Sequence, residues 1–112
     1  MTYNMKLQND PFNKIKNGTK TIEMRLYDEK RQLLKINDTI IFTNINSEET
    51  IKTKIINLYQ FPSFKELYKC FDKKVLGYNK NEKFDSSDMN KYYSLEEQNK
   101  YGVLAIEIEL IK

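Results

Sequence analysis

Four polar side chains that could do chemistry lie together in segment 18–25. Lys20 could act as a positive charge, or as a base if burial lowers its pKa. Glu23 could accept a proton or a ligand N–H, and Arg25 could hold a phosphate or carboxylate with two parallel hydrogen bonds. Thr21, Glu23 and Arg25 recur at every second residue, so a strand would place them on one face. This spacing predicts either one wall of a ligand cleft or the solvated face of an ordinary strand.

Three more residues are candidate ligand contacts. Arg31 stands out in a lysine-rich chain, and it either contacts a phosphate at the cleft mouth or pairs with a neighbouring acid. Tyr93 follows another tyrosine, and two consecutive side chains cannot face one core. It could therefore stack on a base, with core packing as the alternative. Ser63 has the spacing of a helix N-cap, although a helix N-terminus can also hold an anion.

The composition excludes several kinds of active site. The chain has no histidine, which removes Ser-His-Asp and Cys-His catalysis, histidine bases and histidine metal sites. Its single cysteine, Cys70, excludes an internal disulfide, and we expect it to be buried as a small apolar side chain. No group of carboxylates has metal-ligand spacing, so we expect neither a metal nor another cofactor. The net charge of +3 permits a polyanionic partner without requiring one.

Length and hydropathy bound the organisation of the chain. Its 112 residues suffice for one domain, which we expect to span residues 1–112 and to be a monomer. No segment reaches the ~18 apolar residues that cross a membrane. The first residues also lack the apolar core of a secretory signal. We therefore expect a cytoplasmic protein without a membrane partner.

Apolar periodicity and capping residues indicate the elements that must position these side chains. Patterns of period two predict strands over 1–8, 20–27, 39–44, 50–59 and 103–110. Helix signals, including Asp10 as an N-cap, predict short helices over 11–17, 64–71, 87–93 and 95–101. Five or six strands interrupted by helices at unequal intervals favour a small barrel or a strongly bent sheet. The lysine-rich loop 73–83 either closes over a ligand or is simply mobile.

The segment G-T-K-T-I-E-M-R-L-Y-D-E-K-R, followed by L-L-K-I-N-D-T-I-I-F, resembles the ASCH domain of the PUA-like superfamily. The opening M-K-L-Q-N-D-P-F-N-K-I-K-N-G and the closing Y-Y-S-L-E-E-Q-N-K-Y-G-V-L-A-I-E-I resemble small bacterial members. The resemblance implies an α+β fold, a small PUA-like β-barrel of about five to six strands with flanking short helices. It also implies a ligand cleft beside the strand that carries Lys20 and Arg25, with RNA or a modified nucleoside as the ligand.

Some ASCH relatives are amidohydrolases that remove the acetyl group from acetylcytidine. They carry K-T-I-T, with the second threonine as nucleophile and the lysine as its activator. Lys20 matches that lysine, but Glu23 stands where the nucleophile would be. Thr21 does not replace it, because the two positions differ by ~6.6 Å along a strand. The relatives also use a later glutamate, which could correspond to any of three acids, Glu82, Asp85 or Asp88.

Three hypotheses follow. The first is a domain that binds RNA or a modified nucleoside or nucleotide through Lys20, Thr21, Glu23 and Arg25, helped by Arg31, Ser63 and Tyr93. The second is a hydrolase acting on RNA or on an acylated nucleoside, with Lys20 and Glu23 as the catalytic acid and base. The third is a protein-interaction module that has kept the barrel and lost the pocket. An open cleft lined by positive charge would favour the first two.

Overall fold

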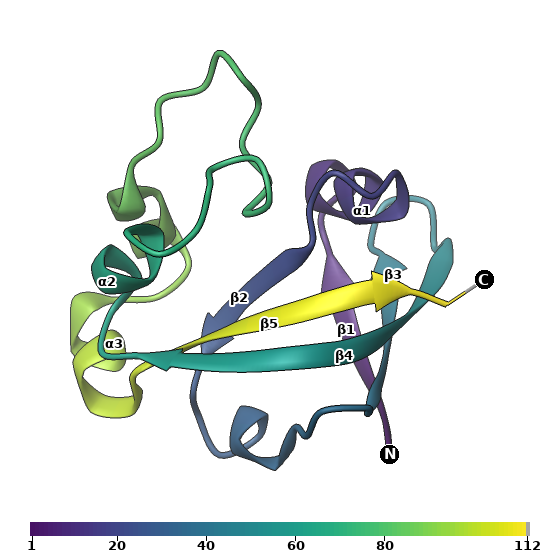
Figure 1. Ribbon diagram of the computed structural model, residues 1–112, viewed down its shortest axis with the longest axis horizontal. Helices are drawn as coiled ribbons and strands as arrows, with labels where there is room; N and C mark the ends of the chain where they lie inside the picture. Colours follow the sequence, from purple (N-terminus) through teal and green to yellow (C-terminus); the bar gives the residue numbers. More distant parts are fainter. Residues whose placement is uncertain (112) are drawn as a thin grey trace.

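A five-stranded mixed sheet lies at the centre of the computed structural model, which describes residues 1–111 (Figure 1). Lys112, the last residue of the expected domain, lies outside the described residues. The strands are β1 (Thr2–Leu7), β2 (Ile22–Leu26), β3 (Thr39–Asn44), β4 (Thr50–Phe61) and β5 (Val103–Leu110). The α-helices are α1 (Asn9–Lys16), α2 (Phe64–Tyr68) and α3 (Leu95–Tyr101), and two short 3₁₀ helices are η1 (Arg31–Leu33) and η2 (Ser86–Lys91).

The sheet is curled into a half-barrel. Its strand order is β1-β3-β4-β5-β2, with β1 parallel to β3 and the other pairs antiparallel. Strands β1 and β2 are the two edges of the sheet, yet they approach each other. A hydrogen bond shows this: the Arg25 Nη2 atom on β2 donates to the Lys6 carbonyl oxygen on β1 at 3.2 Å. The predicted α+β class and the predicted bent sheet are confirmed, with five strands.

The first half of strand β5 is buried on both faces because it separates two hydrophobic clusters. The inner cluster, enclosed by the curl and α1, comprises Met5, Leu7, Phe12, Ile15, Leu34, Ile40, Phe42, Ile55, Leu104, Ile106 and Ile108. The outer cluster, beneath α2 and η2, comprises Ile22, Met24, Leu26, Phe64, Leu67, Tyr68, Leu76, Met89, Val103 and Ala105. Figure 1 shows α2, α3 and η2 grouped at one end of the sheet, and α1 beside the start of β2. The two clusters hold β2 between the curl and the helices.

The helix caps follow the sequence signals only in part. Ser63 accepts a hydrogen bond from the Glu66 backbone N–H, and Ser94 forms a complete capping box with Glu97, as their spacings predicted. Asp10 is not the N-cap of α1: the helix begins two residues earlier than predicted, after Gln8, and Asp10 lies in its first turn. There its carboxylate pairs with Lys14 one turn along the helix at 2.9 Å.

The expected extension of α2 to residue 71 is wrong, because the helix ends at Tyr68. Phe71 packs instead against β4, with its ring centroid 5.4 Å from that of Tyr59 and 6.1 Å from that of Phe61. Cys70 lies in the turn between them and is exposed, so its expected burial is also wrong. Within residues 1–111, no helix combines the length and apolar character needed to span a membrane.

Candidate functional site

Three charged side chains form a buried network at the open edge of the curled sheet. Glu23 pairs with Ile106 and Arg25 with Leu104 across the β2–β5 ladder, so both side chains share a face with residues of the inner cluster. Only 5% of Glu23 is exposed. The alternative of a solvated strand face is therefore wrong for this position, because the curl of the sheet turns the polar face inward.

Glu23 is the centre of this network. Its Oε2 atom accepts from Arg25 Nε at 2.9 Å and lies 2.8 Å from Arg25 Nη2. Its Oε1 atom lies 3.4 Å from the Lys20 ammonium, which is 5% exposed and also donates to the Leu76 carbonyl oxygen at 3.1 Å. One carboxylate thus neutralises part of two positive charges, and the guanidinium also ties β2 to β1.

The two cations decide the ionisation of Glu23. Burial by itself would raise the pKa of this carboxyl, but the charges and hydrogen bonds of Lys20 and Arg25 outweigh burial and lower it. For Arg25, burial would lower the pKa, and the charge of Glu23, with a smaller contribution from Tyr93, raises it instead. Glu23 is therefore a carboxylate and Arg25 a guanidinium at neutral pH, and Glu23 offers acceptor atoms only.

We expect this network to make the folded state sensitive to acid. Folding lowers the pKa of Glu23 below its value of about 4.5 in the unfolded chain. The stability that the network contributes is therefore complete above that pH and is lost as the pH falls through the lower folded pKa. Urea unfolding followed between pH 7 and pH 3 should show this loss.

The control is the apolar variant Lys20→Met/Glu23→Leu/Arg25→Met, whose pH dependence should be shallower than that of the wild type. Asp38, which pairs with the N-terminal ammonium and has a lowered pKa, titrates in both proteins and cancels in the comparison. Identical pH profiles for the two proteins would contradict the assignment of a lowered pKa to Glu23.

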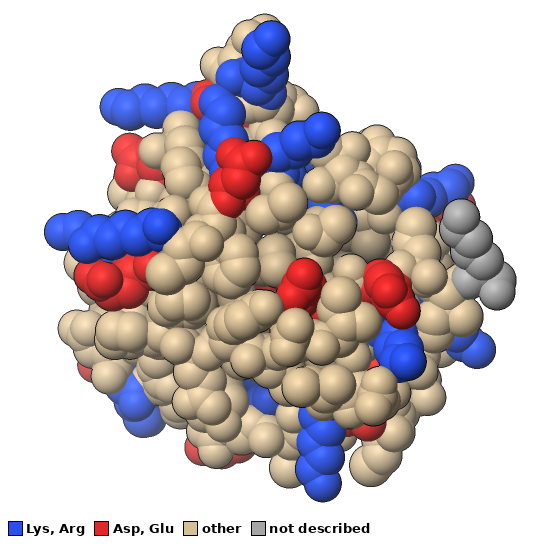
Figure 2. Space-filling model, viewed as in Figure 1, with Lys and Arg blue, Asp and Glu red and all other residues tan. Residues whose placement is uncertain are grey.

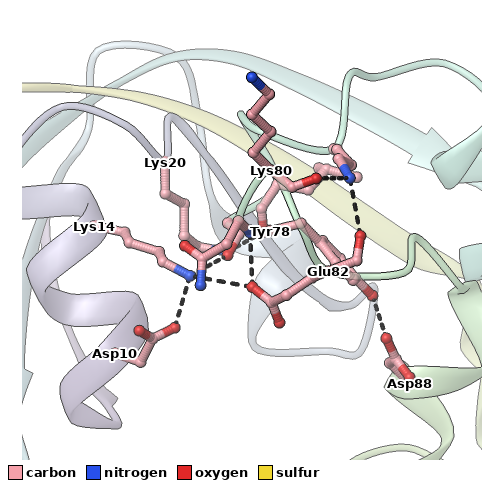
Figure 3. A network of polar contacts seen from close by, with 11 residues as sticks. Asp10, Lys14, Lys20, Tyr78, Lys80, Glu82 and Asp88 are labelled. Carbon is pink, nitrogen blue, oxygen red and sulfur yellow. Dashed lines mark hydrogen bonds and ion pairs between the residues drawn. The ribbon is translucent and has the colours of Figure 1, made fainter.

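A buried lysine from α1 fixes the loop that faces β2. Figure 3 shows Lys14 reaching from α1 toward this loop, with Asp10 on its own helix and Glu82 on the loop near its ammonium. The Lys14 Nζ atom donates to the Gly77 carbonyl oxygen at 2.7 Å, pairs with Asp10 at 2.9 Å and lies 3.7 Å from Glu82. Together with Lys20, which holds the preceding carbonyl, Lys14 makes loop 73–83 a wall of the site.

Hydrogen-bonded tyrosines hold the far side of the same wall. Tyr78 donates to the Asp88 carboxylate at 2.7 Å, so its oxygen accepts from Tyr68, 2.8 Å away. The Phe84 ring stacks on Tyr68 at 4.7 Å and meets Tyr78 edge-on at 5.1 Å. Burial raises the pKa of Tyr68 to about 12, and chiefly burial raises the pKa of Tyr78 as well. Both hydroxyls therefore remain protonated donors at neutral pH.

These elements enclose a cleft of about 630 Å³ between the end of β1, strand β2 and segment 76–93. Its cationic lining residues are Lys6, Lys20, Arg25 and Lys91; its acids are Glu23, Glu82 and Asp88; its tyrosines are Tyr68, Tyr78, Tyr92 and Tyr93. The volume is in the usual range for small-molecule sites, roughly 300–1,000 Å³. In the view of Figure 2, Lys and Arg side chains stand mainly around the outline of the molecule. Several of them lie where Figure 1 shows loop 73–83.

The structure brings together four of the candidate residues and leaves three outside. The cleft lining includes Lys20, Glu23, Arg25 and Tyr93. Tyr93 is also half-buried, since its ring stacks on Phe64 with 5.7 Å between the centroids.

Thr21, Arg31 and Ser63 do not line the cleft. Thr21 precedes β2 and bonds through its backbone to residues 75 and 108. Arg31 pairs with Asp28 at 3.1 Å, which is the intrachain alternative considered for it. Ser63 caps α2.

Several lining residues were missed from the sequence. Tyr92 is 65% exposed and is the more accessible of the two consecutive tyrosines that line the cleft. Lys6, Tyr78 and Lys91 carry no local signal, because only the curl of the chain brings their segments to β2. Of the three later acids, Glu82 and Asp88 line the cleft, whereas Asp85 caps η2 through Ser87. The described residues contain no group of three potential metal ligands.

Comparisons with known proteins agree with this fold. The family model of the ASCH domain matches residues 5–112. No curated protein matches the sequence. Among solved structures, the hypothetical protein PH0355 is 35% identical, with a TM-score of 0.82 over 99% of this chain and 100% of that one. Protein PF0455 from Pyrococcus furiosus is 32% identical, with a TM-score of 0.74 over 100% and 99% of the two chains.

A more distant match is an ASCH protein from Zymomonas mobilis. It is 14% identical, with a TM-score of 0.69 over 97% of this chain and 69% of that one. At this level of identity the likeness concerns the fold alone.

Proposed function

The chain belongs to the ASCH family of PUA-like domains, and from this premise we propose that its cleft binds a nucleoside unit, free or within RNA, by its base. The observation that carries the proposal is the Glu23 carboxylate, which is buried, ionised and part of the cleft lining. The cleft draws on both the N-terminal part of the chain and segment 76–93, so residues 1–112 would act as one domain.

The carboxylate supports recognition of a base that presents an amino group. An ionised Glu23 can only accept hydrogen bonds, so it favours a ligand N–H and repels a carbonyl oxygen at the same position. The exocyclic amine of cytosine is a partner that Glu and Asp accept from in nucleic-acid recognition. Lys20 and Arg25 keep the carboxylate in place and ionised, so this acceptor is preorganised before a ligand binds.

Tyrosines support the stacking part of the proposal. Tyr92 is exposed at the cleft, and Tyr93 and Tyr78 line it beside charged residues. Aromatic side chains next to basic groups are the usual platform for an unpaired base, and each stacked base contributes about 1–3 kcal/mol. The open cleft also supports a ligand site over the alternative of an interaction module without a pocket.

The same contacts favour binding over the hydrolase alternative. A general base needs a pKa near the working pH, whereas that of Glu23 is lowered. The Lys20 ammonium is engaged by Glu23 and by the Leu76 carbonyl oxygen, and so it has no free role as an activator. Glu23 also stands at the position of the threonine nucleophile of the amidohydrolase relatives, so the cleft lacks that group.

The test compares cytidine with uridine by calorimetry on the unaltered protein. The two nucleosides have the same shape, and uridine has a carbonyl oxygen where cytidine has its amine. We expect cytidine to bind about tenfold or more tightly, because uridine would set an oxygen against the Glu23 carboxylate. Equal affinities would contradict base reading by Glu23.

Tyr92 provides a second variable in the same experiment. Tyr92→Ala should lower the affinity for both nucleosides by a similar factor. Tyr92→Phe, which keeps the ring, should bind them with the wild-type affinity. An alanine variant that binds as tightly as the phenylalanine variant would exclude stacking on this residue.

A further inference from the structure

The cations of the cleft divide into two sets. Lys20 and Arg25 are engaged by Glu23 and by backbone carbonyl oxygens. Lys6 and Lys91 are exposed, and within residues 1–111 neither forms an ion pair or donates a side-chain hydrogen bond. The buried set is therefore committed to holding the Glu23 carboxylate, and the exposed set has charge available for a ligand.

The two exposed lysines belong to different walls of the cleft. The Lys6 backbone oxygen accepts from Arg25 at 3.2 Å, which places the end of β1 directly beside it. Lys91 ends η2 two residues before Tyr93, and both residues line the cleft. The mouth of the cleft thus carries a cation on the β1 side and another on the η2 side.

The remaining acids of the lining already have partners. The Glu82 Oε1 atom accepts from the Asn79 backbone N–H at 2.7 Å and lies 3.7 Å from Lys14. Asp88 accepts from the Tyr78 hydroxyl at 2.7 Å. Neither carboxylate pairs with Lys6 or Lys91, so the positive charge at the mouth has no counter-ion from the described chain.

We propose that Lys6 and Lys91 form a phosphate seat at the mouth of the cleft. The inference rests on the proposed function and adds to it: the ligand is a nucleotide, its base inside at Glu23 and its phosphate between the two lysines. Ammonium groups bind phosphate oxygens as point charges and tolerate variable geometry, which suits exposed side chains on separate elements. The phosphate is either the terminal group of a mononucleotide or a phosphodiester of RNA.

The test measures the affinities of cytidine and cytidine 5′-monophosphate by calorimetry at one fixed salt concentration. The wild type should prefer the monophosphate about tenfold. Lys6→Ala and Lys91→Ala should each reduce this preference about threefold, the effect of an exposed ion pair. The double variant should bind the two ligands equally, with its affinity for cytidine unchanged.

The matched control is Lys52→Ala/Lys65→Ala, which removes two exposed lysines outside the cleft lining and changes the net charge equally. It should retain the preference for the monophosphate. If it loses that preference as the Lys6/Lys91 double variant does, or if the wild type has no preference, the seat is overturned.

The outcomes separate the seat from the proposed base recognition. A monophosphate preference that depends on the two lysines, together with equal binding of cytidine and uridine monophosphates, would support the seat and refute base reading. Absence of binding by any of these ligands would overturn both.

A trinucleotide with cytidine in the middle and no terminal phosphate identifies the source of the phosphate, a mononucleotide or RNA. Loss of its affinity in the double variant supports a phosphodiester; no change, with the monophosphate effect intact, supports a terminal phosphate.

Discussion

Glu23→Gln should lower the free energy of unfolding by about 3–5 kcal/mol, the usual cost of removing one partner from a buried ion pair. The reason is that Lys20 is only 5% exposed and Arg25 is half-buried, and both depend on this one carboxylate for their counter-charge. A neutral amide keeps one accepting oxygen but carries no charge, so it leaves two positive charges unpaired in a region shielded from water. Urea unfolding at neutral pH measures the difference directly.

The matched control is Glu109→Gln, the same chemical change at an exposed glutamate of β5. It should change stability by less than about 0.5 kcal/mol. The variant Lys20→Met/Glu23→Leu/Arg25→Met removes all three charges and should be more stable than Glu23→Gln alone, because no charge is then left unpaired. If Glu23→Gln costs no more than Glu109→Gln, the buried network contributes nothing to stability.

Gly77→Ala should destabilise the fold by about 2–3 kcal/mol and reduce ligand binding. Gly77 has a φ of +102°, which L side chains rarely adopt. A Cβ atom at this position would also lie 3.1 Å from the Lys20 Cδ atom. That side chain cannot move aside, because Glu23 and the Leu76 carbonyl oxygen hold its ammonium. The substitution would therefore push directly on the buried network.

Gly18→Ala separates backbone strain from crowding. Gly18 has a similar φ of +86°, but a Cβ there meets nothing within 4 Å. It should cost only about 1 kcal/mol, the strain of the backbone alone, and should leave nucleoside binding unchanged. Equal losses in the two variants, by thermal and urea unfolding, would show that the approach of Gly77 to Lys20 has no energetic consequence.

Most of the fold could be predicted because its signals are local. The alternation in β2 and β5 and the capping box at Ser94 depend on neighbours within a few residues, and the structure contains all three elements. The errors arose where tertiary contacts outweigh local preference. Phe71 leaves the expected helix to pack on β4, and Cys70 is exposed as a result.

The candidate site divides in the same way. The period-two spacing of Thr21, Glu23 and Arg25 predicted that these side chains share one face of a strand, with Lys20 at the strand's entry. The sequence could not determine whether that face meets water. The curl of the sheet decides this by bringing β2 toward β1, as the contact between Arg25 and the Lys6 carbonyl oxygen records.

The position of the opposite wall of the cleft was decided by tertiary structure. The residues of segment 76–93 that face β2 have no periodic pattern, and they are positioned by Lys14, Lys20 and the hydrogen bond between Tyr78 and Asp88. The sequence by itself determined the family, the strands and the shared strand face of Glu23 and Arg25, since these depend on local order. Only the tertiary structure decided that Lys20 joins Glu23 and Arg25 in a buried, paired network. It also decided that Lys6 and Lys91 stand at the mouth of the cleft, without an ion pair among residues 1–111. Burial and charge pairing are set by contacts between segments far apart in the chain.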